Sequence, residues 1–153
     1  MRPLMTTPPR DIRSHVVFRM ALFTTITDRA GKHSFTQDFG LTLREYRILA
    51  VIAYMQPVSL SDLVVETVLD AGQVSRNVAK LVRDGQVARE GKARRGGLLA
   101  LTPDGEALYQ RALARGDDLN DQIMADLGAE DREILSRALD VLLKTARANL
   151  PAG

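Results

Sequence analysis

Apolar residues recur at helical spacing in three parts of the chain. Between residues 10 and 30 they fall at steps of three and four, at Ile12, Val16, Met20, Phe23, Ile26 and Ala30. A second stripe runs through residues 103–127, and a wider one runs through residues 130–150. Such stripes predict amphipathic helices, and the width of the last indicates partners on more than one side. Gly31 follows the first stripe, so we expect that helix to end there and residues 31–41 to form a loop.

Three helix starts follow one another in the middle of the chain. Each combines an N-cap residue with an acidic or amide residue three positions later, and the pairs are Thr42 with Glu45, Ser59 with Asp62, and Asp70 with Gln73. The N-cap oxygen accepts a hydrogen bond from an otherwise unpaired N–H of the first turn. The three starts predict helices over residues 42–55, 60–67 and 71–84.

The pattern changes after Gly85 to short apolar runs. Residues 87–90 and 98–101 flank a glycine-rich tip at residues 91–97, which predicts a two-stranded hairpin. Thr102 and Pro103 are typical of the N-cap and first position of a further helix. Three short helices followed by a hairpin form the layout of a winged helix-turn-helix. We therefore predict a mainly α fold with a small β-hairpin wing.

Charge is distributed unevenly although the net charge is only +2. Between Gly72 and Gly97 there are seven basic residues against two acidic ones. Between Asp117 and Asp140 there are eight acidic residues against two basic ones. The basic stretch suits a polyanion such as double-stranded DNA, because clustered Lys and Arg attract phosphates.

The predicted helix over residues 71–84 is the best candidate for contact with DNA. Its periodicity buries Val74, Val78, Leu81 and Val82 and leaves the polar side chains on the other face. A helix fits the major groove of B-DNA, which is about 12 Å wide. Amide and guanidinium groups suit base edges, whereas hydroxyl and ammonium groups suit phosphates. The candidate contacts are Gln73, Arg76 and Asn77 for bases, and Ser75 and Lys80 for phosphates.

The tip of the predicted hairpin is a second candidate DNA contact. It is short and basic, and it lies between glycines. Arg is favoured in narrow minor grooves, where the negative potential is concentrated. The candidate residues are Lys92, Arg94 and Arg95. A solvated basic tip without a DNA partner is the plainer alternative.

Other classes of function find little support in the residues. There is no cysteine, and the only histidines are His15 and His33. No nucleophile elbow, phosphate-binding loop or dinucleotide fingerprint occurs. We therefore predict a protein that is not an enzyme and has no catalytic residues, metal site or cofactor. The longest apolar run, residues 48–55, is far shorter than the roughly 20 residues of a membrane span, and we expect a cytoplasmic protein.

The sequence resembles the MarR family of dimeric winged-helix transcriptional regulators. The matching motifs are LTLREYRILAVIA (41–53), SLSDL (59–63), DAGQVSRNVAKLVRDGQV (70–87) and RRGGLLALTPDGEAL (94–108). Three positions depart from the family pattern. Ala93 stands where an Asp usually precedes the wing arginines, Val68 where the turn often has Gly, and Gly72 where a polar residue is more usual.

The resemblance implies a DNA-binding lobe over residues 42–102 and a helical dimerisation region over residues 10–30 and 103–150. It implies a homodimeric, sequence-specific DNA-binding regulator of the repressor type. It also implies a small aromatic or anionic effector, for which the candidate pocket residues are His15, Arg19, Tyr46 and Arg47. The alternative is a winged-helix dimer that acts as a protein-interaction module without DNA binding, because Ala93 and Gly72 weaken the DNA-binding surface.

Overall fold

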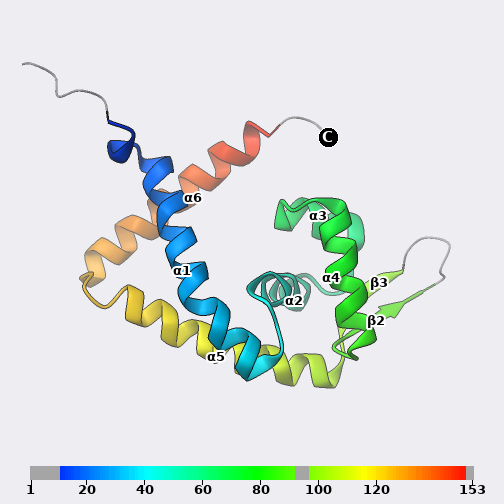
Figure 1. Cartoon of the computed structure of the whole chain (residues 1–153). Coiled ribbons are helices and arrows are strands. Elements are labelled where there is room, and N and C mark those ends of the chain that lie inside the picture. Colours follow the sequence, from blue (N-terminus) through cyan, green and yellow to red (C-terminus); the bar gives the residue numbers. More distant parts are fainter. Residues whose placement is uncertain (1–10, 92–96, 151–153) are drawn as a thin grey trace, which may run out of the picture. The chain divides into compact units, whose positions relative to one another are not determined.

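The computed structural model describes residues 11–91 and 97–150 (Figure 1). The chain divides into two units, one ending at Ala112 and the other beginning at Leu113, and each is described by itself. In chain order the elements are a 3-10 helix (Ile12–Ser14), α1 (Val16–Phe39), α2 (Leu43–Met55), β1 (Val58–Ser59), α3 (Leu60–Thr67), α4 (Ala71–Arg83), β2 (Val87–Glu90), β3 (Leu98–Leu101), α5 (Pro103–Ile123) and α6 (Ala129–Ala148). The prediction of a mainly α winged helix is confirmed.

The first helix is longer than predicted. α1 continues through Gly31 to Phe39, so the expected loop over residues 31–41 is wrong. Gly31 is buried within the helix, and Phe35 beyond it is also buried. The ring of Phe35 lies 4.8 Å from that of Tyr46 and 5.5 Å from that of Phe39, measured between centroids. Tertiary packing of this aromatic group therefore extends the helix, which ends at Gly40 in the left-handed conformation.

The three predicted capped helices are confirmed. Thr42 and Glu45 form a complete capping box at the start of α2. The side chain of Ser59 accepts from the backbone N–H of Asp62 at 3.1 Å, and Asp70 accepts from that of Gln73 at 2.9 Å. These caps satisfy first-turn donors that would otherwise lack partners, so they set where α3 and α4 begin.

One apolar core joins the helices of the first unit to its sheet. It combines side chains from α2, α3 and α4 with one residue from each strand, one from the start of α5, and Leu41 from the turn between α1 and α2. Its buried members are Leu41, Ile48, Leu49, Ile52, Val58, Leu63, Val74, Val78, Leu81, Val87, Leu99 and Leu108. The predicted inward face of α4 is confirmed for Val74, Val78 and Leu81, whereas Val82 is only partly buried.

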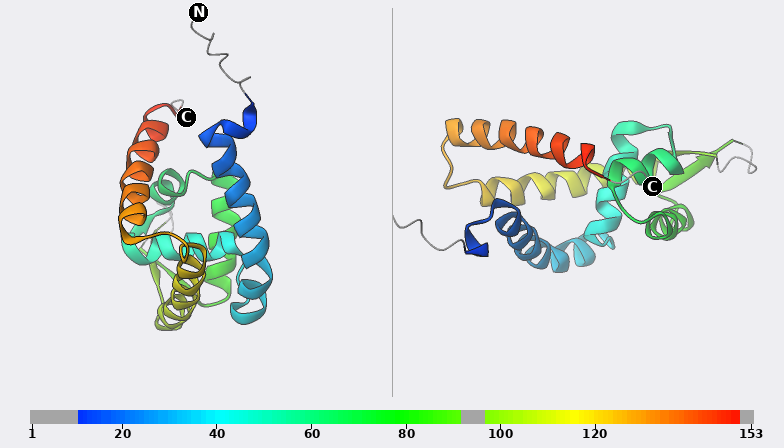
Figure 2. Two further views of the ribbon diagram at one scale, coloured as in Figure 1. Left: turned by 90° about the vertical axis from the view of Figure 1, so that its left-hand side faces the viewer. Right: turned by 90° about the horizontal axis from the view of Figure 1, so that it is seen from above.

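The sheet has three antiparallel strands in the order β1-β3-β2. The expected hairpin is present, with Val87 paired to Leu101 and Glu90 to Leu98. The third strand, β1, was not predicted, because two residues are too few to show a strand pattern. It pairs Val58 with Leu99 and so ties the segment before α3 to the hairpin. In Figures 1 and 2 the hairpin strands extend outward beyond α4.

The start of α5 is fastened to the turn that precedes β2. The hydroxyl of Thr102 donates to the carbonyl of Gly85 at 2.6 Å and accepts from the N–H of Gly105 at 3.0 Å. The N–H of Thr102 donates to the carbonyl of Gln86 at 3.1 Å. The prediction of Thr102 as an N-cap is confirmed, and these bonds bring the backbones of Gly105 and Gln86 close together.

The second unit contains the end of α5 and all of α6. α5 ends at Ile123, before the predicted Leu127, and Arg132 on α6 secures the turn that follows. Its guanidinium donates to the carbonyls of Met124 at 2.7 Å and Leu127 at 3.0 Å. The large apolar side chains of α6 are mostly exposed, namely Ile134, Leu135, Val141, Leu142 and Leu143.

Val68 occupies a backbone conformation that suits glycine. It ends α3 with φ 54° and ψ 28°, in the left-handed region. This region costs an L-residue about 1–2 kcal/mol, and a β-branched side chain fits it worst. The side chain of Val68 is 52% exposed, so its removal gives up little burial.

We expect Val68→Gly to raise the free energy of unfolding by about 1 kcal/mol, because the backbone strain is relieved. Urea denaturation measures the change. Val65→Gly is the matched control: Val65 is 75% exposed within α3, and there glycine should cost about 1 kcal/mol. Equal losses in both variants would contradict the assignment of strain to Val68.

Candidate nucleic-acid interface

α4 has one face in the core and one turned away from it. The buried face consists of Val74, Val78 and Leu81. Of the predicted DNA contacts, Ser75 and Arg76 are exposed on the other face. Gln73, Asn77 and Lys80 are partly buried. Two of the five candidate side chains are therefore accessible to DNA, and the other three are partly covered by the rest of the protein.

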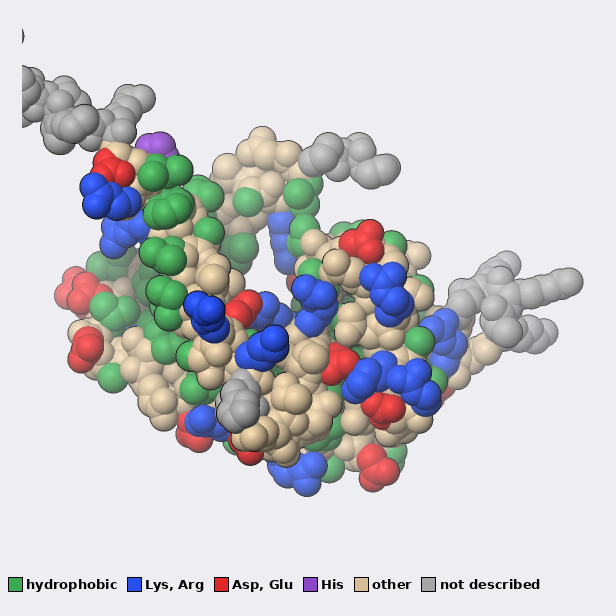
Figure 3. All heavy atoms as spheres, in the orientation of Figure 1, with side chains coloured by type: hydrophobic (Ala, Val, Ile, Leu, Met, Phe, Trp, Pro, Cys, Tyr) green, Lys and Arg blue, Asp and Glu red, His purple; other side chains and the backbone are tan. Residues whose placement is uncertain are grey.

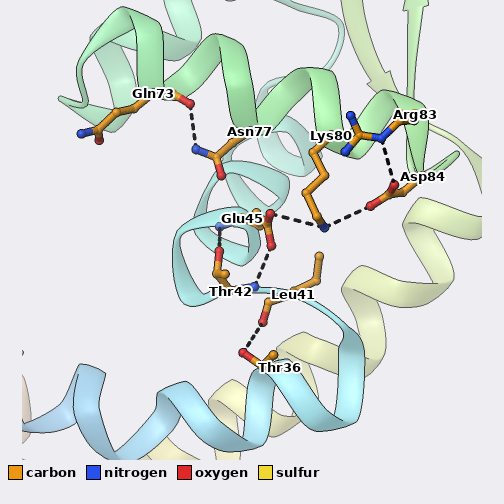
Figure 4. A network of polar contacts seen from close by, with 9 residues as sticks. All are labelled: Thr36, Leu41, Thr42, Glu45, Gln73, Asn77, Lys80, Arg83 and Asp84. Carbon is orange, nitrogen blue, oxygen red and sulfur yellow. Dashed lines mark hydrogen bonds and ion pairs between the residues drawn. The ribbon is translucent and has the colours of Figure 1, made fainter.

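Asn77 bonds within its own helix. Its side-chain amide donates to the backbone carbonyl of Gln73 at 2.7 Å (Figure 4). A hydrogen bond of this length keeps the Asn77 amide against the preceding turn of α4. To meet a base edge in the predicted way, the Asn77 side chain has to leave this bond, whereas Arg76 has no such contact to break among the described residues.

Lys80 lies between two carboxylates of the first unit. Its Nζ is 3.3 Å from Oε1 of Glu45 and 3.0 Å from Oδ2 of Asp84 (Figure 4). The side chain of Glu45 is only 6% exposed, and its other oxygen accepts from the N–H of Thr42 at 2.7 Å. Lys80 therefore neutralises a buried carboxylate and holds α4 against α2. Sequence reasoning missed this because Glu45 is far from Lys80 along the chain.

Burial lowers the pKa of Lys80, but contacts with Asp84 and Glu45 outweigh burial and leave the pKa above its usual 10.5. A raised pKa means that the pair stabilises the fold fully below pH 10.5. The contribution is lost as the pH rises through the folded-state value.

We expect Lys80→Met to lower the free energy of unfolding by about 1–3 kcal/mol at pH 7, because it leaves Glu45 buried without its cation. This variant should also lose less stability than the parent protein between pH 10 and 12. Arg83→Met is the control, because the side chain of Arg83 is 71% exposed and its ion pair with Asp84 is long, with 3.8 Å between Nε and Oδ1. Urea denaturation at several pH values measures both variants, and equal effects would contradict a special role for Lys80.

Basic side chains gather over α4 and the strands beside it (Figure 3). Arg76 and Arg83 are exposed on α4, and Arg89 is exposed on β2. The predicted wing contacts, Lys92, Arg94 and Arg95, lie outside the described residues, and their role stays a prediction. The strands β2 and β3 lie beside α4 (Figure 1), which is the arrangement that a winged helix requires.

The four candidate pocket residues do not come together within the chain. His15 and Arg19 are exposed at the start of α1. Tyr46 packs on Phe35, and Arg47 pairs with Asp28 at 2.6 Å. Arg19 and Asp28 are nine positions apart on one helix, about 14 Å along its axis. The four candidates therefore lie in two separate places, His15 and Arg19 at the start of α1 and Tyr46 and Arg47 on α2.

Arg47 lines a pocket of about 420 Å³ between α1, α2 and α4. Its lining combines basic, acidic and neutral polar side chains with one leucine, namely Asp28, Lys32, Thr42, Leu43, Arg44, Glu45, Arg47 and Asn77. Within the described ranges, no cluster of three or more His, Cys, Asp or Glu residues could hold a metal ion. None of the described helices is long and apolar enough to span a membrane.

Comparison with known proteins identifies the same region. The MarR family model matches residues 39–97, which include α2, α3, α4 and β2. A curated relative is the HTH-type transcriptional regulator BilQ of Clostridium symbiosum. It is 28% identical over 116 residues, covering 74% of this chain and 81% of the relative.

Solved structures share the fold over nearly the whole chain. A MarR/EmrR family transcriptional regulator from Acinetobacter sp. ADP1 matches with TM-score 0.81 and 22% identity, covering 90% of this chain and 98% of that one. A MarR-family regulator from Listeria monocytogenes, complexed with 26mer DNA, matches with TM-score 0.80 and 17% identity, covering 88% and 91%. CouR from Rhodococcus jostii RHA1, bound to p-coumaroyl-CoA, matches with TM-score 0.79 and 20% identity, covering 94% and 99%. The family model therefore matches the DNA-binding motif, and the chain as a whole is similar in sequence and fold to winged helix-turn-helix transcriptional regulators of the MarR family.

Proposed function

We propose that the protein is a homodimeric repressor that binds a specific operator through α4. The observation that carries this proposal is the position of Arg76, exposed on the face of α4 opposite its buried valines and leucine. An Arg in this position can donate two hydrogen bonds to a guanine edge in the major groove. The structure of the Listeria relative in complex with DNA supports the same use of the fold.

The homodimer is part of the proposal because two helices expose apolar side chains. On α1 these include Val16, Phe23 and Ile26, and on α6 they include Leu142 and Leu143. Exposed apolar side chains at helical spacing are typical of an interface between chains. A two-fold dimer would present two copies of α4 to half-sites about one DNA turn, roughly 34 Å, apart. Such a regulator acts in the cytoplasm, where its operator lies.

The first experiment is a salt titration of DNA binding. Fluorescence anisotropy measures the dissociation constant for the DNA upstream of the protein's own gene and for a scrambled duplex of equal length. We expect selective binding, with log K falling by about 0.9 per phosphate neutralised for each unit of log salt. Absence of binding to any duplex at low salt, from a folded dimer, would overturn the proposal and favour the protein-interaction module.

Control by a small anionic ligand is a further part of the proposal. The pocket beside Arg47 offers two more cations, Lys32 and Arg44, and it touches α4 through Asn77. A ligand weakens operator binding only if it prefers the arrangement that does not bind DNA. The probe is 4-hydroxybenzoate, added to the complex of protein and operator. Release from the parent protein with no release from Arg47→Ala supports this site, and equal release from both places the ligand elsewhere.

A further inference from the structure

Gly72 lies in the first turn of α4, one turn before Arg76, and it has no backbone requirement for glycine. The positive φ angles of the described residues belong to Val68 and to Gly40, Gly85, Gly91 and Gly97, and not to Gly72. Glycine within a helix costs about 0.5–1 kcal/mol relative to alanine. A reason for glycine must therefore come from what surrounds the position.

The space above Gly72 is occupied by the guanidinium of Arg76. A Cβ atom at position 72 would lie 3.2 Å from Nη1 of Arg76 and 3.1 Å from Oδ1 of Asp70. Both distances are shorter than ordinary carbon contacts with nitrogen or oxygen. Residues four apart lie on the same face of a helix, and side chains lean toward the N-terminus. Arg76 therefore lies back across the first turn, and it fits there because position 72 carries no side chain.

No ion pair accounts for this placement of Arg76. Among the described residues Arg76 makes no salt bridge. The carboxylate of Asp70 caps the N–H of Gln73 at 2.9 Å instead. The guanidinium is free to bond a ligand, and the bare backbone at Gly72 sets the direction in which it extends.

We infer that Gly72 is a specificity-determining residue, which acts by letting Arg76 extend across the first turn of α4 and so selects the base pair that Arg76 meets. The inference rests on the proposed function. A methyl group at position 72 moves the guanidinium away from the first turn. Because a bidentate contact depends on the direction of approach, the preferred base or its position then changes.

The test is a double-mutant cycle on the full-length dimer. The parent protein, Gly72→Ala, Arg76→Ala and the double variant are each used to select operators from a library of randomised half-sites. We expect Gly72→Ala to change the preference at the position where Arg76→Ala relaxes it, and to weaken binding to the parent operator at least fivefold. In the Arg76→Ala background, the second substitution should change neither quantity. Ala71→Ser is the control, because it alters the neighbouring exposed position and should leave the preference intact.

Three outcomes overturn the inference. One is an unchanged base preference in Gly72→Ala while the parent protein selects a clear site, which leaves the proposed function standing. Another is a change in base preference or affinity caused by Gly72→Ala that is equally large in the Arg76→Ala background. Glycine would then be needed because it lets the backbone of α4 approach DNA closely, and not because of Arg76. A parent protein that selects no sequence overturns both the inference and the proposed function. Thermal unfolding of each variant confirms that the fold is kept, and Gly72→Ser, a second variant, must shift the same position.

Discussion

Gly105→Ala is expected to lower the free energy of unfolding by about 3 kcal/mol or more, since overpacking of this kind is costly. A Cβ at position 105 would lie 1.8 Å from the carbonyl oxygen of Gln86 and 2.8 Å from its carbonyl carbon. Neither atom can move easily, because Thr102 holds this turn through its bonds to Gly85 and Gln86. The start of α5 must therefore detach, or the chain before β2 must shift.

Urea denaturation followed by circular dichroism measures this loss. Gly128→Ala is the control, because a Cβ there would meet nothing closer than 3.9 Å and φ is −65°. Its effect should stay below about 1 kcal/mol, the usual cost of Ala at an N-cap. A Gly105→Ala protein as stable as this control would show that the turn and α5 separate at little cost.

Local signals were enough to predict the helices at the centre of the fold. The caps at Thr42, Ser59 and Asp70 each use a side chain and an N–H three residues away, so the pattern lies within four residues of sequence. The buried face of α4 follows from helical periodicity alone. The exposure of Arg76 was predictable for the same reason, since it lies on the face opposite Val74 and Val78.

Contacts between distant residues account for what was missed. α1 extends past Gly31 because Phe35 meets Tyr46, which lies on another helix. The strand β1 exists because Leu99 pairs with Val58 across more than forty residues. Lys80 suits a phosphate by residue type alone, whereas in the fold it pairs with the buried Glu45. A pattern along the chain contains no information on such partners.

The same limit applies to Gly72. Its departure from the family pattern is visible in the sequence, but its consequence is not. As a residue type, glycine at the start of a recognition helix indicates a weakened DNA-binding surface. In the structure the guanidinium of Arg76 lies next to the space that a side chain at position 72 would occupy. Glycine at position 72 removes one possible DNA contact, and we propose that it also sets the direction of Arg76. The second effect is visible only when both residues are placed in the fold.

The second large effect is expected from Leu142→Asp on α6, which should convert the proposed dimer into monomers. Leu142 is 45% exposed in the chain alone, among further apolar residues of the same helix. Burying a carboxylate between apolar surfaces without a partner costs several kcal/mol. A monomer binds one half-site at a time, so it loses the avidity of two linked binding sites, which raises affinity about 100-fold or more. Operator affinity should fall by at least that factor.

Light scattering coupled to size exclusion gives the mass, and anisotropy gives the affinity for the operator. Lys144→Asp is the control, because it makes a larger change of charge on the same helix at a polar, exposed position. It should remain a dimer and bind the operator. A Leu142→Asp protein that stays dimeric would exclude this face of α6 from the interface and leave α1 as the remaining candidate. Monomers that still bind the operator tightly would instead show that one copy of α4 is sufficient, and the half-site model would fail.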